Sequence, residues 1–258
     1  MKRTEPSTDL KLIEAAIALL PAVGFSRLSL RAVAKKAGVN LGMFHYYFKT
    51  KREFMRRVAE VFYEDFFREF TLKAASGKDP KEKLYNALFN LACFARNHRQ
   101  LLLALGRDIL EGDQQIVKLL EEHVPRHAVI ILDLIRQCQR QRLIAQAPLP
   151  IIITYIISSV AGPSIMMGAL EKANLKPPLN IIKNVGIPIM MKDHILRMRL
   201  DLAFRALDPD VSLESMPSAL NRRINQIIDF YLDRNRRKTP EEPLQTTGSS
   251  RLKTRRMS

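Results

Sequence analysis

Apolar residues recur every three or four positions along most of this 258-residue chain, which is the spacing of one face of an α-helix. The first such stretch covers residues 8–23, with Thr8 or Asp9 placed to cap its start and Gly24 placed to end it. Pro21 lies in the last turn and lacks a backbone donor, so we expect this helix to tighten or to end early.

Two short helices are expected next. Ser29 can cap the first, which stops at Gly38, and Asn40 can cap the second, which runs to about Tyr47. Two short helices joined by a turn that contains glycine form a helix-turn-helix. The second helix of such a unit can enter the major groove of DNA.

The remainder of the chain also follows the helical pattern. The residues TKRE form a capping box, in which Thr50 and Glu53 bind each other's free amides, and they open a long helix that ends near Gly77. We expect four or five more helices up to about residue 207, with breaks near Asn97, Gly112, Pro125 and Pro148. Residues 172–193 contain three prolines and predict an irregular crossover, and a last amphipathic helix is expected over 213–232. No stretch has the pattern of a strand, so the predicted fold class is all-α.

The second short helix carries an unusual run of rings. Residues 37–51 read AGVNLGMFHYYFKTK, with five ring-bearing residues in a row. Phe44 and Phe48 are four apart and should face the core, while Gly42 would let the backbone come close to DNA. The remaining faces carry donors that suit phosphate oxygens, on His45, Tyr46, Tyr47 and Lys51. The stretch therefore predicts a helix that is half core and half DNA-binding surface.

The positive charge of the chain is concentrated at its two ends. The formal charge is +16, and residues 1–57 carry 12 Lys and Arg against 4 Asp and Glu. Residues 58–221 are nearly neutral, with 20 Lys and Arg against 18 Asp and Glu. Residues 222–258 carry 10 Lys and Arg against 4 Asp and Glu. A basic module and a basic tail on a neutral body favour a polyanionic partner such as nucleic acid. The tail either contacts nucleic acid or only keeps the chain soluble.

The segments LIEAAIALLPAVGF and LSLRAVAKKAGVNLGMFHYYFKTKREF resemble the N-terminal domain of the TetR family of bacterial transcriptional regulators. The resemblance implies a three-helix helix-turn-helix DNA-binding domain over residues 1–57. It implies a larger helical domain for ligand binding and dimerisation over 58–232, and we expect 233–258 to be a basic, disordered tail. It also implies a cytoplasmic homodimer that binds a double-stranded DNA operator and releases it when a small-molecule effector binds. His45 and Arg52 depart from the family's usual residues, which bears on affinity and sequence preference.

Carried over by position, the resemblance assigns roles to individual side chains. The residues implied nearest the bases are Leu41, Gly42, Met43 and Tyr46. The residues implied on phosphates are Ser29, His45, Tyr47 and Lys51, and Arg31 would reach either. Leu41, Gly42 and Met43 cannot form the paired hydrogen bonds that read guanine or adenine. Readout should therefore depend on thymine methyl groups, Arg31 and the shape of the duplex.

Two other features of the sequence lead to competing interpretations. Residues 147–170 are uncharged and long enough to span a bilayer, so the alternative is a membrane-associated helical protein. Prolines and hydroxyl residues interrupt this segment, and the resemblance instead implies a helix buried between the core and the dimer interface. His123 and His127 lie four apart, but Pro125 lies between them, so we expect no metal site. No motif of an enzyme or of a bound cofactor is present.

Overall fold

A computed structural model describes residues 7–211 and 218–236, and every regular element in these two ranges is a helix. The first seven helices are α1 (Thr8–Val23), α2 (Leu30–Ala37), α3 (Leu41–Tyr47), α4 (Lys51–Ala75), α5 (Pro80–Asn97), α6 (Arg99–Leu110) and α7 (Gln114–Arg140). They are followed by α8 (Leu149–Val160), α9 (Gly162–Lys172), the π-helical turn η1 (Ile182–Gly186), α10 (Ile187–Met190), α11 (Asp193–Ala206) and α12 (Ser218–Arg236). The predicted all-α class is confirmed.

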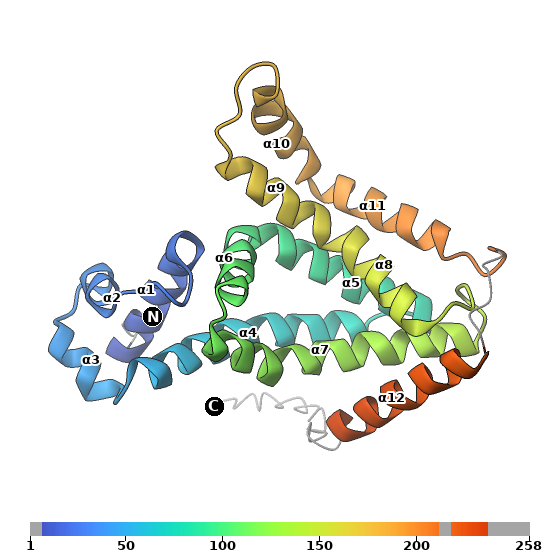
Figure 1. Cartoon of the computed structure of the whole chain (residues 1–258), viewed down its shortest axis with the longest axis horizontal. Helices are drawn as coiled ribbons and strands as arrows, with labels where there is room; N and C mark the ends of the chain where they lie inside the picture. The colour runs from blue at the N-terminus through green and yellow to red at the C-terminus, as the bar shows by residue number, and fades with distance from the viewer. Residues whose placement is uncertain (1–6, 212–217, 237–258) are drawn as a thin grey trace, which may run out of the picture.

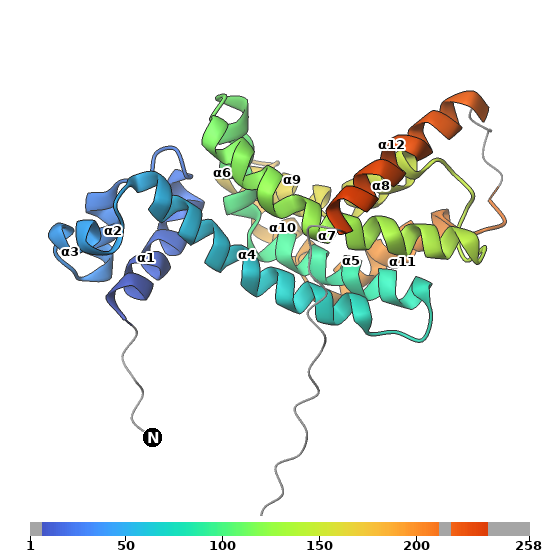
Figure 2. The ribbon, with the colours of Figure 1, turned by 90° about the horizontal axis from the view of Figure 1, so that it is seen from below.

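The helices form a small unit and a larger bundle that share one long helix. Helices α1 to α3 and the start of α4 make the small unit at one end of the molecule (Figure 1). Helix α4 continues into the larger bundle and packs there against α5 and α7, while α6 lies between this bundle and α1. Helix α10 projects from the bundle beyond α9 (Figure 1), and α12 packs against α7 at an angle (Figure 2).

Two hydrophobic cores correspond to these two parts. The core of the small unit is built around Phe44 and Phe54, and it also includes Leu101 of α6 and Ile116 of α7. The core of the bundle takes its α4 residues from Phe66 onward. Because α4 supplies both cores and two bundle residues reach into the first, the small unit is packed directly onto the bundle.

The short helices begin where their capping residues predict. The Ser29 hydroxyl accepts from the Ala32 amide at 3.5 Å, and the Asn40 side chain accepts from the Gly42 amide at 2.8 Å. Thr50 accepts from the Glu53 amide at 3.1 Å. This half of the predicted capping box is confirmed, but the other half is wrong, because the Glu53 carboxylate accepts from the amide of Lys49 and not from that of Thr50.

The prolines interrupt the helices less than predicted. Helix α1 continues through Pro21 to Val23, and α7 continues through Pro125 to Arg140, so neither predicted disruption occurs. A proline removes one backbone hydrogen bond, and buried residues on both sides of Pro125, at Ile116 and Ile131, keep α7 packed against its neighbours. The N-cap of α1 was also predicted wrongly, because the helix already includes Thr8 and has no side-chain cap.

The other predicted breaks are confirmed, since α5, α6, α7 and α8 are separated near Asn97, Gly112 and Pro148. The region from residue 80 to 207 contains seven α-helices, more than the four or five predicted, because Ala161 separates α8 from α9 and the crossover contains α10. The last helix was predicted to end at residue 232, but α12 continues to Arg236, so residues 233–236 of the predicted disordered tail are helical. The predicted start of this helix at residue 213 and the tail from residue 237 onward lie outside the described residues.

The uncharged segment at residues 147–170 folds as α8 and α9. The stretch Leu149–Lys172 is long and apolar enough to cross a membrane by length and composition. However, Ile152, Ile156 and Val160 are buried in the core of the bundle, where α8 packs against α5, α7 and α11. The opposite face of α8 exposes Ile151 and Tyr155. In this structure the segment is divided into two helices, and α8 is a packed element of the helical bundle, so the membrane alternative is not favoured.

Candidate nucleic-acid interface

The turn between α2 and α3 fixes how the second helix is presented. Gly38 has φ 68° and ψ 30°, the left-handed conformation that glycine adopts without strain. A Cβ atom on Gly38 would meet no other atom within 4 Å, so the requirement for glycine is conformational and not one of space. The Val39 amide then donates to the Ala34 carbonyl at 3.0 Å, and Asn40 starts α3 two residues after the glycine.

Three phenylalanine rings anchor the inner face of α3. Phe44 is fully buried, and its ring centroid lies 5.0 Å from that of Phe54 in an edge-on arrangement. Phe48 lies 4.8 Å from the same Phe54 ring. Edge-on aromatic pairs add to the stabilisation from burial. The inner face therefore holds α3 against α4, and its other faces remain outside.

The predicted base-contacting residues lie on the outer faces, with one exception. Tyr46 is 80% exposed and Met43 is 37% exposed, and Gly42 is also exposed. Tyr46 stands edge-on to the ring of Tyr47 at 5.0 Å, which holds both phenols on the outer surface. Leu41 differs, because it is half-buried and packs against the core of the small unit. Its side chain is less accessible to a base than the sequence suggested.

The predicted phosphate-binding residues are exposed around this helix. Ser29 uses a lone pair of its hydroxyl as the cap of α2 and keeps the hydroxyl proton to donate to a phosphate. Lys51, at the start of α4, extends its Nζ to 3.5 Å from the Ser26 carbonyl. His45, Tyr47 and Arg31 are also exposed. All of these side chains come from α2, α3, α4 or the residues that border them.

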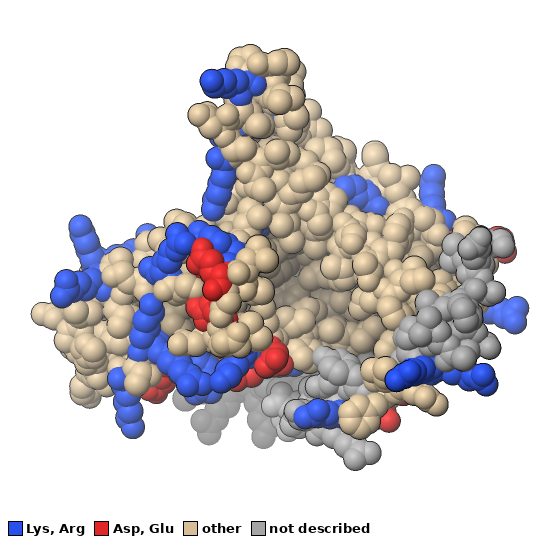
Figure 3. Space-filling model, in the orientation of Figure 1, with Lys and Arg blue, Asp and Glu red and all other residues tan. Residues whose placement is uncertain are grey.

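Basic residues that were not predicted as phosphate contacts also lie around this surface. Lys35 and Lys36 lie in the last turn of α2, and Lys49 and Arg52 flank Lys51. All four are exposed, and they add positive charge on both sides of α3. Figure 3 shows Lys and Arg side chains gathered over the part of the molecule where α1 to α4 lie. The pair KK in AVAKKAG was the sequence signal that could have identified the α2 members.

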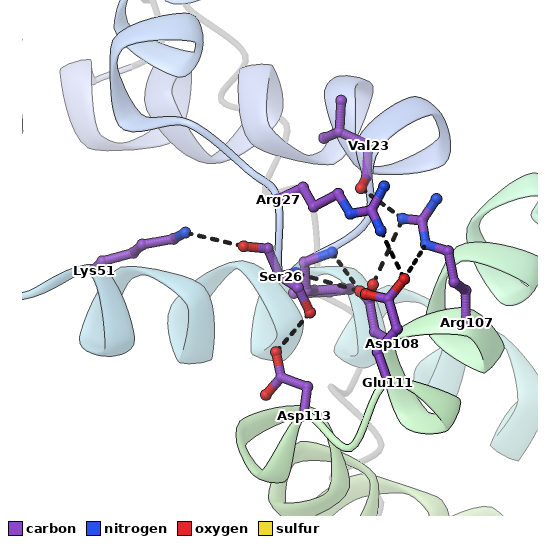
Figure 4. Close-up of polar contacts among 9 residues, drawn as sticks. Val23, Ser26, Arg27, Lys51, Arg107, Asp108, Glu111 and Asp113 are labelled. Carbon is purple, nitrogen blue, oxygen red and sulfur yellow. Dashed lines mark hydrogen bonds and ion pairs between the residues drawn. The ribbon is translucent and has the colours of Figure 1, made fainter.

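A second polar cluster, with no signal in the sequence, joins the small unit to the bundle. We call it the turn clamp: Arg107, Asp108, Glu111 and Asp113, at the end of α6 and the start of α7, bound to Val23–Arg27 between α1 and α2 (Figure 4). Asp108 is fully buried, and its Oδ2 accepts from the amides of Phe25 at 2.8 Å and Ser26 at 3.3 Å.

Further bonds surround this carboxylate. Arg107 donates to the Val23 carbonyl at 2.7 Å, and Arg27 forms an ion pair with Glu111 at 2.7 Å. The Ser26 hydroxyl donates to Asp113 at 2.6 Å, and this bond lowers the pKa of the Asp113 carboxyl. The turn clamp therefore fixes the position of the α1–α2 turn relative to the bundle.

The turn clamp requires glycine at position 24 for two reasons, its backbone conformation and the space around it. Its φ of 79° disfavours other residues. A Cβ atom there would also lie 2.6 Å from the Arg107 guanidinium and 2.8 Å from the Asp108 carboxylate. The sequence pattern alone predicted only a helix stop at Gly24.

A cavity of about 470 Å³, open to the surface on one side, lies next to the turn clamp and is lined by residues of α4 to α9. Phe25 also lines it, so one residue contributes its backbone amide to the turn clamp and its ring to the cavity. The volume falls within the range of roughly 300–1,000 Å³ that is typical of small-molecule sites.

The two histidines considered as metal ligands lie in the wall of this cavity. His123 Nδ1 lies 2.8 Å from the Leu119 carbonyl, and His127 Nδ1 lies 2.9 Å from the Tyr63 hydroxyl. The described residues contain no group of three His, Cys, Asp or Glu side chains placed to hold a metal ion.

Comparisons with known proteins agree on one family. Residues 12–58 match the model of "Bacterial regulatory proteins, tetR family". The chain is 30% identical over 159 residues to the "Probable HTH-type transcriptional regulator YttP" of Bacillus subtilis, covering 61% of this chain and 77% of that protein. It is 22% identical over 184 residues to the uncharacterized HTH-type transcriptional regulator Rv2912c of Mycobacterium tuberculosis, covering 70% of this chain and 94% of that protein.

Solved structures share the fold at low sequence identity. A TetR transcription regulator from Haloarcula marismortui has a TM-score of 0.58 at 12% identity and covers 78% of this chain and 97% of its own. The transcriptional regulator FadR from Bacillus subtilis, solved with stearoyl-CoA, has a TM-score of 0.53 at 15% identity. The match covers 70% of this chain and 96% of the FadR chain. These similarities show that the helical domain, and not only the N-terminal unit, follows the same architecture.

Proposed function

Because this chain belongs to the tetR family of bacterial regulatory proteins, we propose that it is a ligand-responsive repressor that binds a palindromic operator as a homodimer. The observation that carries the proposal is the position of Phe25, in the DNA-binding unit and in the cavity wall at once. A molecule in the cavity would contact the unit that carries α3. We divide the chain as the sequence suggests, into a DNA-binding part over 1–57 and a regulatory part over 58–232.

In this proposal α3 enters the major groove and α2 and α4 hold the flanking backbone. Gly42 would let the α3 backbone approach the base edges, and Met43 and Tyr46 would contact thymine methyls and base edges. The side chains proposed on phosphates are Ser29, His45, Tyr47 and Lys51, with Arg31 on either. Lys35, Lys36 and Arg52 would add to the electrostatic attraction without sequence preference. Leu41 would contribute mainly by packing.

The proposed dimer interface is the exposed apolar face of α8 and α11. On α8 this face carries Ile151, at 52% exposure, and Tyr155, at 38%. On α11, which packs against α8, Met198 and Leu202 are exposed at 54% and 58%. Large exposed apolar faces on a protein mark interaction sites. A second copy of this chain would cover both helices and set the distance between the two α3 helices.

Release of DNA would follow from a change in this distance. Two recognition helices must lie about 34–36 Å apart to reach successive major grooves. A ligand that fits a differently spaced dimer better weakens DNA binding by its difference in affinity for the two states. The turn clamp would pass movement of α6 and α7 to the α1–α2 turn, because Asp108 ties the two parts together. The relatives are transcriptional regulators, and we place this chain in the bacterial cytoplasm with no role as an enzyme.

The test is selection of DNA sites from a random pool with the purified full chain. The proposal predicts enrichment of an inverted repeat, with two chains bound per duplex in light scattering of the complex. Enrichment of a site without twofold symmetry, or one chain per duplex, would contradict the dimeric arrangement. A Tyr46→Ala variant selected in parallel serves as the control, because it should enrich sites poorly while keeping its helical circular dichroism.

A further inference from the structure

The chemistry of the cavity wall points to the kind of molecule that it holds. This inference rests on the proposed function, since it concerns the ligand of the same regulatory site. The wall contains no Lys, Arg, Asp or Glu among the described residues. Its only side chains with hydrogen-bonding atoms are Tyr63, His123 and His127. Figure 3 shows a hollow of uncharged surface on this face, beside the DNA-binding unit.

Each of the three polar side chains of the wall already makes one hydrogen bond within the protein. The Tyr63 hydroxyl and His127 Nδ1 are 2.9 Å apart. The rings of Tyr63, Phe66 and Phe70 lie around His127, and the ring of His123 lies against Tyr63. Burial lowers the pKa of His127 to about 4, so its ring is neutral near pH 7. His123 Nδ1 donates to the Leu119 carbonyl, because a carbonyl can only accept.

Arg126, a cation that lies beside the wall, already has an anionic partner. Arg126 lies 5.5 Å from the centre of the Tyr63 ring and 4.0 Å from that of Phe67. Its guanidinium forms an ion pair with Glu64. A charged ligand in the cavity would therefore lose its hydration without finding a free counter-ion, which is costly. An apolar ligand would gain from burial against leucine, isoleucine and phenylalanine side chains.

We propose that the effector of this regulator is an uncharged, mainly hydrocarbon or aromatic small molecule that lies wholly within the cavity lined by α4 to α9 and Phe25. The cavity is within reach of solvent, because Val124 and Ile157 line it and are also 40% and 37% exposed. Such a ligand would touch the Phe25 ring, whose amide is held by Asp108. The competing possibility is an anionic amphiphile, whose chain enters while its head group stays outside.

Two matched pairs of probes separate these possibilities on the purified full chain without DNA. 1-N-phenylnaphthylamine and 8-anilinonaphthalene-1-sulfonate share one aromatic skeleton and differ by a sulfonate. Titrated by fluorescence, the neutral probe should bind more tightly by about 10-fold or more, because the sulfonate has no partner in the wall. In competition, 1-dodecanol should displace the neutral probe at concentrations at which laurate does not.

Replacement of two alanines by phenylalanine, one inside the cavity and one outside it, shows where the probe binds. Ala128 lines the cavity from α7, so Ala128→Phe should fill part of it and weaken binding of the neutral probe. Ala75 is exposed at the end of α4, so Ala75→Phe makes the same change away from the cavity and should leave binding unaltered. Circular dichroism verifies that each variant is folded, and Leu105→Phe, also in the wall, replaces Ala128→Phe if that variant does not fold.

The outcomes are distinct from those that test the proposed function. Absence of binding by the neutral probe, or binding that Ala128→Phe and Leu105→Phe leave unchanged, would overturn the inference. Equal or tighter binding of the sulfonate, or equal displacement by laurate, would overturn the uncharged class and favour the anionic amphiphile. No DNA is present in these titrations, so a failure to bind an operator would not alter their result.

Discussion

Replacement of Asp108 by alanine should loosen the α1–α2 turn and lower the stability of the whole chain. The Asp108 side chain is fully buried and accepts from two backbone amides, of which that of Phe25 is buried and that of Ser26 is partly buried. A buried donor left without an acceptor costs about 1–3 kcal/mol, and the second, partly hydrated donor costs less. Asp108→Ala should therefore lower the free energy of unfolding by about 2–4 kcal/mol.

Two measurements check this expectation. Urea denaturation followed by circular dichroism gives the change in the free energy of unfolding. Hydrogen exchange followed by mass spectrometry reports on residues 23–28, where the Phe25 and Ser26 amides should exchange faster in the variant because their acceptor is gone.

Asp65→Ala is the control, because it removes a carboxylate from an ion pair with Arg68 whose two side chains are 72% and 75% exposed. Surface pairs contribute about 0–1 kcal/mol, so this control should be close to wild type in both measurements. Wild-type stability and wild-type exchange at Phe25 in Asp108→Ala would refute the reasoning, since the turn would then be held by packing alone.

Four further predictions concern DNA, pH and assembly. Lys51→Ala should weaken binding to all DNA sequences and reduce the salt dependence by about one unit of slope, in binding titrations over a salt series. Tyr46→Ala should cost about 1–3 kcal/mol on the selected site and much less on random DNA, measured side by side. His127 has its pKa lowered to about 4 in the fold, so the unfolded chain takes up its proton first as the pH falls below about 6.5. Stability should fall between about pH 6.5 and pH 4, and His127→Gln should remove about 2 kcal/mol of the loss between pH 7 and pH 5 in urea titrations. Leu202→Arg should give monomers in light scattering, because it places an unpaired charge in the proposed interface.

Each of these has an outcome that contradicts it. An unchanged salt slope would remove Lys51 from the DNA backbone, and equal losses on both DNAs would make Tyr46 a positioning residue. A pH dependence that is identical in wild type and His127→Gln would mean that the His127 ring is solvated. For the dimer, Leu72→Arg is the control, since Leu72 is 60% exposed on α4. An intact dimer in Leu202→Arg would place the interface elsewhere.

The local structure of the DNA-binding unit could be predicted from the sequence because its signals are local. Ser29, Asn40 and Thr50 bind amides two or three residues away, and Gly38 supplies the left-handed turn. The separation of Phe44 from Tyr46 on opposite faces follows from helical spacing alone. These features required no knowledge of the remainder of the chain.

The turn clamp and the cavity could not be predicted in the same way. Asp108 binds Phe25 across 83 positions in sequence, and no local pattern distinguishes it from a surface aspartate. The half-buried state of Leu41 likewise depends on packing with the core of the small unit. The break predicted at Pro125 does not occur, because tertiary packing on both sides of this proline outweighs the loss of one hydrogen bond. What was missed therefore depends on contacts between distant segments.

The central claim is that the occupant of the cavity controls the affinity for DNA. The most direct test is fluorescence anisotropy of the selected operator with the full chain at one fixed salt concentration, with and without saturating 1-N-phenylnaphthylamine. The account predicts an operator affinity that is weaker by about 5- to 150-fold when the probe is bound, the usual range of coupling between two sites. The fluorescence of the probe, recorded on the same samples, verifies that the cavity is occupied. An unchanged operator affinity with the cavity occupied would contradict the account.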